Sequence, residues 1–533
     1  MKKRILTVFW TTFVCLIAFV KAEPSRPNVV IIMVDDMGWS DISCYGGEIP
    51  TPHIDSLADE GIRFTQFYNT SRCCPTRASL LTGLYQHQTG IGHMTSEGQW
   101  DFDYGVDGFR GRMNLNCVTI AEVLKSAGYD TCMTGKWHLG SEKPNDRPLQ
   151  RGFDHFYGSL AGAFSFFKPH GERGLTLGNQ RLPEPDPETY YCTDAFSDYA
   201  VDFIKEHGDS PFFLYVAYNA PHWPLHAKEE DIEKFVGKYM EGWDVLRQKR
   251  FDRQVEMGIF EEKLGVSPRD PTVRPWEDVP AQQKKDSDYR MAVYAAQVYS
   301  VDYNVGKIVD ALRAEGELDN TLILFLSDNG ACAEPYTEFG GGEMSDINDP
   351  DNGGMVSYGS GWANLSNTPF RHYKNRPEEG GIATPLIAHW PKGIKSSLEG
   401  TFVRDVGHII DFMPTILEIS GAKYPRMHRN ELIHPYEGES LTPFFKNGAR
   451  ANPQPYFFEH SKNLAVRMDD WKILGRYGEW NWELYNVVED RNELTNLASK
   501  HPEVVDKMAH EWEKWALRTN AAPRGIKPPN SYD

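Results

Sequence analysis

Four short apolar runs, each followed directly by a polar cluster, constrain the fold of this 533-residue chain most strongly. They span residues 28–34, 129–133, 211–218 and 321–326. Each run has the length and the β-branched or aromatic content of a strand buried on both faces. Helical spacing of apolar residues lies between the runs, for example over 119–127 and 289–315. Alternating strands and helices predict an α/β fold with a large, mixed but mostly parallel central sheet flanked by helices.

The polar clusters after the runs contain the first candidate functional residues. They are Asp35-Asp36, Gly135-Lys136-Trp137-His138, Asn219-Ala220-Pro221-His222 and Ser327-Asp328-Asn329-Gly330. Ligands of open α/β sheets bind at the carboxyl ends of the strands, so we expect one pocket to collect all four clusters.

Two of these clusters are rich in hard oxygen ligands. Asp35, Asp36, Asp328 and Asn329 suit calcium or magnesium better than zinc. A single acidic pair is more often a solvated loop, but two pairs at strand ends favour a metal site.

Cys73 opens a second kind of motif, CCPTRASLLTG over residues 73–83. Pro75 stands where a helix is expected to begin, so Cys73 is predicted just before a helix N-terminus, a natural place to hold an anion. An unmodified thiol there would have a lowered pKa and be reactive. A buried cysteine or a vicinal disulfide with Cys74 is the alternative.

This segment resembles the signature of the formylglycine-dependent sulfatases, in which the first cysteine is oxidised to an aldehyde after translation. Other family landmarks match in order: Asp35-Asp36-Met37-Gly38, Gly135-Lys136-Trp137-His138, Ala220-Pro221-His222, Ser327-Asp328-Asn329-Gly330, Phe370-Arg371-His372-Tyr373-Lys374 and Glu379-Gly380-Gly381. The segments HQTG at 87–90 and SNTPFR at 366–371 are most similar to the bacterial arylsulfatase branch.

The resemblance implies an alkaline phosphatase-like fold and a sulfuric ester hydrolase that carries one divalent cation, usually Ca²⁺. The implied metal ligands are Asp35, Asp36, Asp328, Asn329 and the hydrated aldehyde made from Cys73. Arg77 would steady that hydrate, and the residues implied around the sulfate and its leaving group are Lys136, His138, His222 and Lys374. A formylglycine-generating enzyme would be the partner during maturation.

The chemistry of such a site can be argued from the reaction. A sulfate monoester repels nucleophiles by its own charge, so cation, lysine and arginine must neutralise its oxygens. One hydroxyl of the hydrate, with Asp328 as base, attacks sulfur and releases the alcohol. His138 is the expected base for the second hydroxyl, whose deprotonation expels sulfate, and His222 and Lys374 are expected to protonate or stabilise the departing oxygen.

Four other functions remain open from the sequence. A phosphatase or phosphodiesterase of the alkaline phosphatase group would use serine or threonine and paired zinc ions, and a cysteine hydrolase would give the metal ligands no task. The others are an aryl sulfate specialist and a non-catalytic protein that binds sulfated glycans.

The expected substrate is a sulfated small molecule or oligosaccharide, such as an algal polysaccharide or a glycan fragment. The formal charge is −19, which excludes nucleic-acid binding through bulk charge and requires a local cationic pocket for an anionic substrate. Aromatic residues over 162–170 and the segment 87–93 would line a sugar-binding rim, or else pack in the core.

Residues 1–22 read as a signal peptide with cleavage near Ala22, because a basic start precedes a short apolar stretch. We therefore expect a periplasmic or secreted protein without stable membrane insertion. Residues 23–450 are predicted to form the catalytic domain and residues 451–533 a smaller α+β domain. No CxxC spacing occurs, which argues against zinc fingers and thioredoxin-like chemistry.

Overall fold

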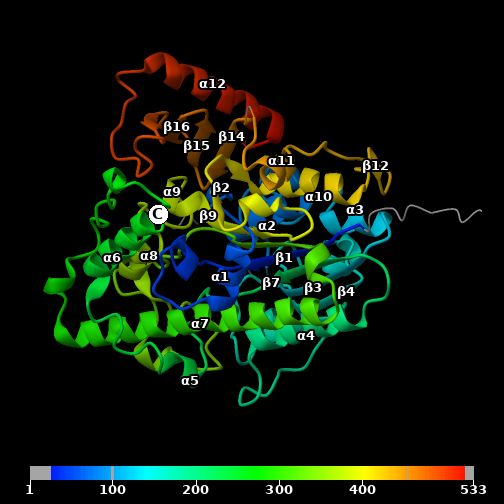
Figure 1. Ribbon diagram of the computed structural model, residues 1–533, viewed down its shortest axis with the longest axis horizontal. Coiled ribbons are helices and arrows are strands. Elements are labelled where there is room, and N and C mark those ends of the chain that lie inside the picture. The colour runs from blue at the N-terminus through cyan, green and yellow to red at the C-terminus, as the bar shows by residue number, and fades with distance from the viewer. Residues whose placement is uncertain (1–25, 98–100, 452, 522–533) are drawn as a thin grey trace, which may run out of the picture.

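The computed structural model describes residues 26–97, 101–451 and 453–521. Within them, one large sheet forms the centre of the molecule and helices cover both of its faces (Figure 1). Its strands are β1 (Asn28–Val34), β2 (Ile62–Tyr68), β3 (Asp130–Lys136), β4 (His155–Ser159), β5 (Leu175–Leu177), β6 (Gln180–Arg181), β7 (Phe212–Ala217), β8 (Thr321–Ser327), β9 (Ala383–His389), β10 (Thr401–Val403) and β11 (Gly407–His408).

The strand order is β10-β2-β9-β8-β1-β7-β3-β4-β5-β6, with β11 also paired to β2. Strands β8, β1, β7, β3 and β4 run parallel to one another. Strand β9 is antiparallel to both of its neighbours, β8 and β2. The predicted mixed, mostly parallel central sheet is therefore confirmed.

Twelve α-helices occur in the described part of the chain, and several of them cover the two faces of the central sheet. They are α1 (Pro52–Asp59), α2 (Cys73–Thr82), α3 (Ile120–Ser126), α4 (Cys192–Glu206), α5 (Glu229–Ile232), α6 (Gly242–Glu256), α7 (Ala281–Ala314), α8 (Gly359–Ser366), α9 (Glu379–Ile382), α10 (Phe412–Ser420), α11 (Thr442–Asn447) and α12 (Pro502–Thr519). Figure 1 shows α4 and α7 along the lower face of the sheet and α2, α3 and α10 above it.

Strand β1 shows why both faces need a cover. All seven of its side chains are buried. Val30, Ile32 and Val34 belong to the core that includes α4 and α7, whereas the residues between them pack in the core under α2, α3 and α10. Burying each such aliphatic side chain stabilises the fold by about 1.5–3 kcal/mol, which favours a central place for this strand.

Two boundaries differ from the sequence prediction. Strand β3 continues to Lys136, although the apolar run was predicted to end at residue 133. Helix α2 begins at Cys73, with Arg72 as its N-cap, so Cys73 is the first helical residue and does not precede the helix. In both cases the strand or helix includes residues beyond the predicted boundary, and these residues are buried in the fold.

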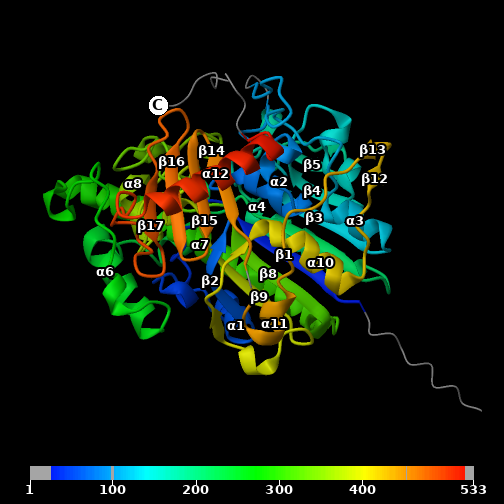
Figure 2. The same cartoon turned by 90° about the horizontal axis from the view of Figure 1, so that it is seen from above.

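A smaller four-stranded antiparallel sheet lies toward the C-terminus. Its strands are β14 (Tyr456–His460), β15 (Asn463–Met468), β16 (Trp471–Arg476) and β17 (Glu483–Asn486). Helix α12 crosses it, as Figure 2 shows, and buries Met508, Trp512 and Trp515. A short hairpin, β12 (Met427–His428) with β13 (Glu431–Leu432), stands apart. The predicted C-terminal α+β unit is thus present, and its boundary at residue 451 stays a prediction.

Among the described residues, no helix combines the length and the apolar character that crossing a membrane requires. The predicted signal peptide, residues 1–22, lies outside the described residues.

We predict that Asp302 makes the stability of the fold depend on pH. Its carboxylate on α7 accepts backbone hydrogen bonds from Ile54 (2.8 Å) and His53 (3.3 Å) at the start of α1. Burial raises its pKa from 3.8 to about 6. Between these two values the unfolded chain releases the proton and the folded chain keeps it, so the free energy of unfolding falls as pH rises, by about 3 kcal/mol.

Asp302→Asn keeps an acceptor oxygen and removes the titration. Urea denaturation at pH 4 and pH 6.5 should show the variant gaining up to about 3 kcal/mol relative to the parent at the higher pH. Asp310→Asn, an exposed position on the same helix, should show no such change. An equal pH dependence in parent and Asp302→Asn would contradict the prediction.

Candidate active site

The four predicted polar clusters follow four adjacent strands of the sheet, β8, β1, β7 and β3. Val34 pairs with Ser327 at the ends of β1 and β8, so Asp35 and Asp328 leave the sheet side by side. Asp328 donates its backbone N–H to Val34 (3.0 Å), and Asp35 donates its own to Ala220 (2.9 Å) after β7. The parallel strands therefore bring the clusters to one edge.

The acidic side chains at this edge are fully buried and in contact. Asn329 donates from Nδ2 to Asp36 Oδ1 (2.6 Å), and the Asp36 backbone N–H donates to Asp328 Oδ1 (3.3 Å). Gly330 permits this tight loop, because a Cβ at that position would lie 1.8 Å from the Gly380 carbonyl oxygen.

Three buried cations face these carboxylates. Arg77 donates to Asp328 Oδ2 from Nε (3.0 Å) and Nη2 (2.8 Å). Lys136 Nζ lies 2.5 Å from Asp35 Oδ2. Lys374, from the loop before α9, places Nζ 2.7 Å from Asp36 Oδ1. Cations and carboxylates thus alternate in a buried site.

The pKa values of Asp328 and Asp36 shift in opposite directions. Burial, reinforced by the charge of Asp35, raises the pKa of Asp328 to about 7 in spite of Arg77. Burial also acts to raise the pKa of Asp36, but the charges of His222 and Lys374 outweigh it and lower that pKa below its ordinary value. The two groups therefore differ in their readiness to hold a proton.

The site fits a hard divalent cation. Asp35 Oδ1 and Asn329 Oδ1 are buried and have no hydrogen-bond partner within the described part of the chain. Buried oxygens of this kind are normally satisfied, so unpartnered ones next to two more carboxylates are suited to bind a cation. Carboxylate and amide oxygens are the donors that calcium and magnesium prefer.

Cys73 lies beside this cluster at the start of α2. The atoms Cys73 Sγ, Cys74 Sγ and one ring nitrogen of His138 lie within 4.8 Å of one another. The side chain of Cys74 and the charges of Lys136 and His138 hold the pKa of Cys73 well below its ordinary value, although burial opposes them. The seven described cysteines are all free, so the vicinal disulfide with Cys74 is not formed.

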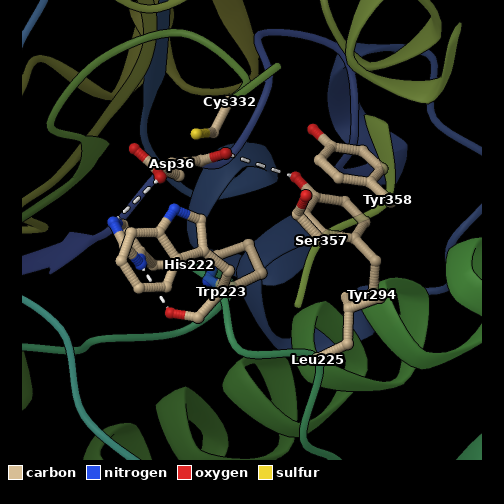
Figure 3. A pocket seen from close by; sticks show the side chains of 9 residues that line it. Asp36, His222, Trp223, Leu225, Tyr294, Cys332, Ser357 and Tyr358 are labelled. Carbon is tan, nitrogen blue, oxygen red and sulfur yellow. Dashed lines mark hydrogen bonds and ion pairs between the residues drawn. The ribbon is translucent and has the colours of Figure 1, made fainter. Parts of the chain in front are cut away.

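The two histidines of the prediction both reach the site. His222 places Nε2 3.3 Å from Asp36 Oδ2 and donates from Nδ1 to the Trp223 carbonyl (2.6 Å), as Figure 3 shows. Burial lowers the pKa of His222 to about 3. Burial also lowers the pKa of His138, whose Nδ1 has no partner in the described residues.

A small cavity adjoins His222 and Asp36 and is also lined by Cys332, Tyr294 and Tyr358 (Figure 3). Its volume open to the centre of a water-sized sphere is about 10 Å³, which is the room that one water molecule needs. This cavity beside His222 therefore has space for a solvent molecule.

The structure brings together every predicted site residue: Asp35, Asp36, Cys73, Arg77, Lys136, His138, His222, Asp328, Asn329 and Lys374. Three further residues lie against them and were not predicted from the sequence: Arg72, Glu334 and Cys332. Arg72 forms an ion pair with Glu334 (2.6 Å), and Cys332 lies 3.5 Å from the same carboxylate. No motif identified them, and only the position of Arg72 next to Cys73 was a signal.

The predicted rim is wrong for Phe164, Phe166 and His87. Phe164 and Phe166 are 1% and 0% exposed and pack in the core, and Phe167 is half-buried against Tyr191 and His226. His87 is buried and lies 2.7 Å from Glu459. Core packing, the alternative, therefore holds for these buried side chains.

Comparison with known proteins agrees with this site. The model of the sulfatase family matches residues 27–422, and that of the C-terminal region of N-sulphoglucosamine sulphohydrolase matches residues 372–517. An uncharacterised sulfatase of Schizosaccharomyces pombe is 33% identical over 94% of this chain and 95% of its own length. An arylsulfatase of Klebsiella aerogenes is 34% identical over 79% of this chain and 92% of its own.

Among solved structures, Ps i-CgsB in complex with k-i-k-neocarrahexaose is similar with a TM-score of 0.67 and 28% identity. The match covers 93% of this chain and 94% of that one. Family match and overall fold agree over nearly the whole described chain, and the chain therefore belongs to the sulfatase family of sulfuric ester hydrolases.

Proposed function

We propose that this protein hydrolyses sulfate monoesters of carbohydrates, using Cys73 in its oxidised formylglycine form and one calcium ion. The observation that carries the proposal is the set of buried carboxylate and amide oxygens that faces Cys73 between Arg77, Lys136 and Lys374. The neocarrahexaose bound by Ps i-CgsB supports a sugar substrate.

Asp35, Asp36, Asp328 and Asn329 would hold the cation, together with the side chain at position 73. When bound, a cation of this kind polarises the oxygens of the sulfate group and favours ionisation of a neighbouring hydroxyl. Calcium is the proposed ion because the donors are all oxygens and several are carboxylates.

Oxidation of Cys73 by a formylglycine-generating enzyme would replace the thiol by an aldehyde, whose hydrate supplies two hydroxyls on one carbon. The chain is suited to such a group. Arg77 lies close to this position, and its guanidinium is kept charged, because the carboxylate of Asp328 raises its pKa in spite of burial. His138 stands within reach as the group that takes a proton from the second hydroxyl.

The lysines and the arginine neutralise the charge of the bound ester. Lys136 and Lys374 are both buried and each contacts one aspartate, so their ammonium groups are held in place before substrate arrives. Donors fixed in a water-poor site stabilise developing charge without reorganising during the reaction.

His222 is proposed to supply the proton to the departing oxygen. The Trp223 carbonyl can only accept, so Nδ1 carries a hydrogen and Nε2 faces the site. In the free protein, burial lowers the pKa of His222 to about 3. An anionic ester next to Nε2 adds negative charge there and favours the protonated form.

We predict that His222→Ala lowers turnover of alkyl and sugar sulfates about 10²-fold more than turnover of activated aryl sulfates, because poor leaving groups need the proton. The measurement is kcat on both substrate classes. His226→Ala, a buried histidine four positions on, should affect both classes equally. Equal losses for His222→Ala would exclude the acid role.

Export is part of the proposal. Residues 1–22 would act as a signal peptide, leaving a periplasmic or secreted chain with a catalytic domain over 23–450 and the smaller unit over 451–533. N-terminal sequencing of the mature protein should begin near residue 23, and a mature chain that keeps residue 1 would contradict export with cleavage.

The test of the function is release of inorganic sulfate from a panel of sulfated sugars and one aryl sulfate, using protein from a host that oxidises the cysteine. Release from at least one sugar sulfate is expected. Release from the aryl sulfate alone would favour an aryl specialist. No release from any compound, with the aldehyde present at position 73, would favour a glycan-binding role.

A further inference from the structure

Two charged side chains, Arg72 and Glu334, lie between the buried catalytic groups and the solvent. The exposed fraction of the side chain is 1% for Asp36 and Lys374, 12% for Glu334 and 15% for Arg72. The contacts follow the same order. Lys374 Nζ lies 2.7 Å from Asp36 and 3.9 Å from Glu334, whose other oxygen lies 2.6 Å from Arg72 Nη1. Because exposure rises along these contacts, we place this pair at the mouth of the site.

The pair offers fixed hydrogen-bonding groups to whatever is attached to the sulfate. Burial acts to raise the pKa of Glu334, but the charges of Arg72 and Lys374 outweigh it and keep the carboxylate ionised. The indole N–H of Trp223 donates a hydrogen bond to the same carboxylate (3.4 Å). Arg72 also donates from Nη1 to Asn375 (2.9 Å), whereas its Nη2 makes no hydrogen bond to a described residue.

Two stacked histidines lie near Arg72, whose Nε donates to Sδ of Met94 (3.1 Å), the residue after His93. The rings of His93 and His460 lie 5.2 Å apart at 20°, and His93 Nε2 is 3.2 Å from Ser461 Oγ. The Nδ1 atoms of both rings are buried and have no partner among the described residues. Buried polar atoms are normally paired. These two nitrogens near Arg72 are therefore free to form a hydrogen bond with a ligand.

His460 comes from β14, in the C-terminal sheet. The turn after it leads to Asn463, which donates from Nδ2 to the Asn375 carbonyl (3.1 Å) beside Lys374. The C-terminal sheet is therefore anchored against the loop that carries a catalytic lysine, and it supplies one of the two stacked rings.

We propose that Arg72, Glu334, His93 and His460 form the subsite that binds the hydroxyl groups of the sugar carrying the sulfate ester. The inference rests on the proposed function and specifies its substrate as a polyhydroxylated alcohol. Glu334 accepts from a hydroxyl, Arg72 donates to one, and the neutral imidazoles supply a donor or an acceptor. A substrate without hydroxyls leaves these groups unpaired, which costs binding in a site of this kind.

The test compares kcat/KM for a sulfated monosaccharide that the parent hydrolyses with kcat/KM for 4-nitrophenyl sulfate. Glu334→Gln removes the charge, and His460→Phe keeps a ring in the stack while removing its nitrogens. We expect each to lose about 10- to 100-fold on the sugar sulfate and to stay within about threefold of the parent on the aryl sulfate. Arg72→Lys, at the more exposed member of the pair, should show the same selective loss if a buried variant fails to fold.

The matched control is Glu338→Gln, which breaks the Arg274–Glu338 pair (2.7 Å) away from these contacts and should change neither substrate. Equal losses on both substrates, or no loss on the sugar, would overturn the subsite and leave the sugar sulfatase function standing. A parent that hydrolyses the aryl sulfate and no sugar sulfate would overturn the proposed function, and the subsite with it.

Discussion

Replacing Cys73 with alanine is expected to abolish sulfate release, with a loss of at least about 10⁴-fold in kcat, because removal of a nucleophile disables every later step. Cys73 is the first residue of α2 and lies within reach of His138 and Lys136. Alanine removes the side chain without adding volume at a fully buried position, so the fold should tolerate the change. The measurement is inorganic sulfate released under single-turnover and steady-state conditions.

Cys74→Ala is the matched control, since Cys74 is an equally buried neighbour on the same helix. We expect it to keep most of the activity. Mass spectrometry of the peptide containing residue 73 should show the aldehyde in the parent and in Cys74→Ala. Loss of activity in Cys74→Ala with retention in Cys73→Ala would transfer the nucleophile to the second cysteine, and equal activity of both variants with the parent would refute a nucleophile in this motif.

Asp328→Asn should lower kcat by about 10³-fold, nearly as much as Cys73→Ala. It removes one of the charges that would hold the cation and that orient the Arg77 guanidinium. Its carboxylate accepts two hydrogen bonds from Arg77 through one oxygen and the Asp36 backbone N–H through the other. Asparagine keeps the shape, and the measured quantities are kcat and the calcium content of the purified protein.

Removing the charge of Asp328 also leaves Arg77 in a buried site with one partner fewer, which costs about 3–5 kcal/mol when an ion pair is broken from one side. Asp411→Asn is the matched control. Asp411 forms a buried pair with Arg450 (3.0 Å) beside the C-terminal sheet, so its replacement should lower stability while the folded protein keeps its kcat and its calcium. Normal calcium content and near-normal turnover in Asp328→Asn would refute the proposed metal site.

The local elements of the fold followed from local patterns. The run at 28–34 predicted β1 to the residue, and the run at 321–326 predicted β8 to within one residue. Such runs can be recognised in the sequence because a strand buried on both faces needs apolar side chains at every position. Residue patterns did not predict that β3 extends to Lys136, because its side chain is charged. In the folded protein this side chain is buried and forms an ion pair with Asp35.

The sequence by itself determined the α/β class, the strands that end in acidic clusters, and the motif that singles out Cys73 and Arg77. These are properties of short segments, in which spacing and residue type carry the information. Only the tertiary structure decided that β8, β1, β7 and β3 are neighbours, that Phe164 and Phe166 are core residues, and that Glu334 and Arg72 meet at the mouth of the site. Such contacts join residues that lie far apart in the sequence, and their energy comes from burial and charge pairing that exist only after the sheet has assembled.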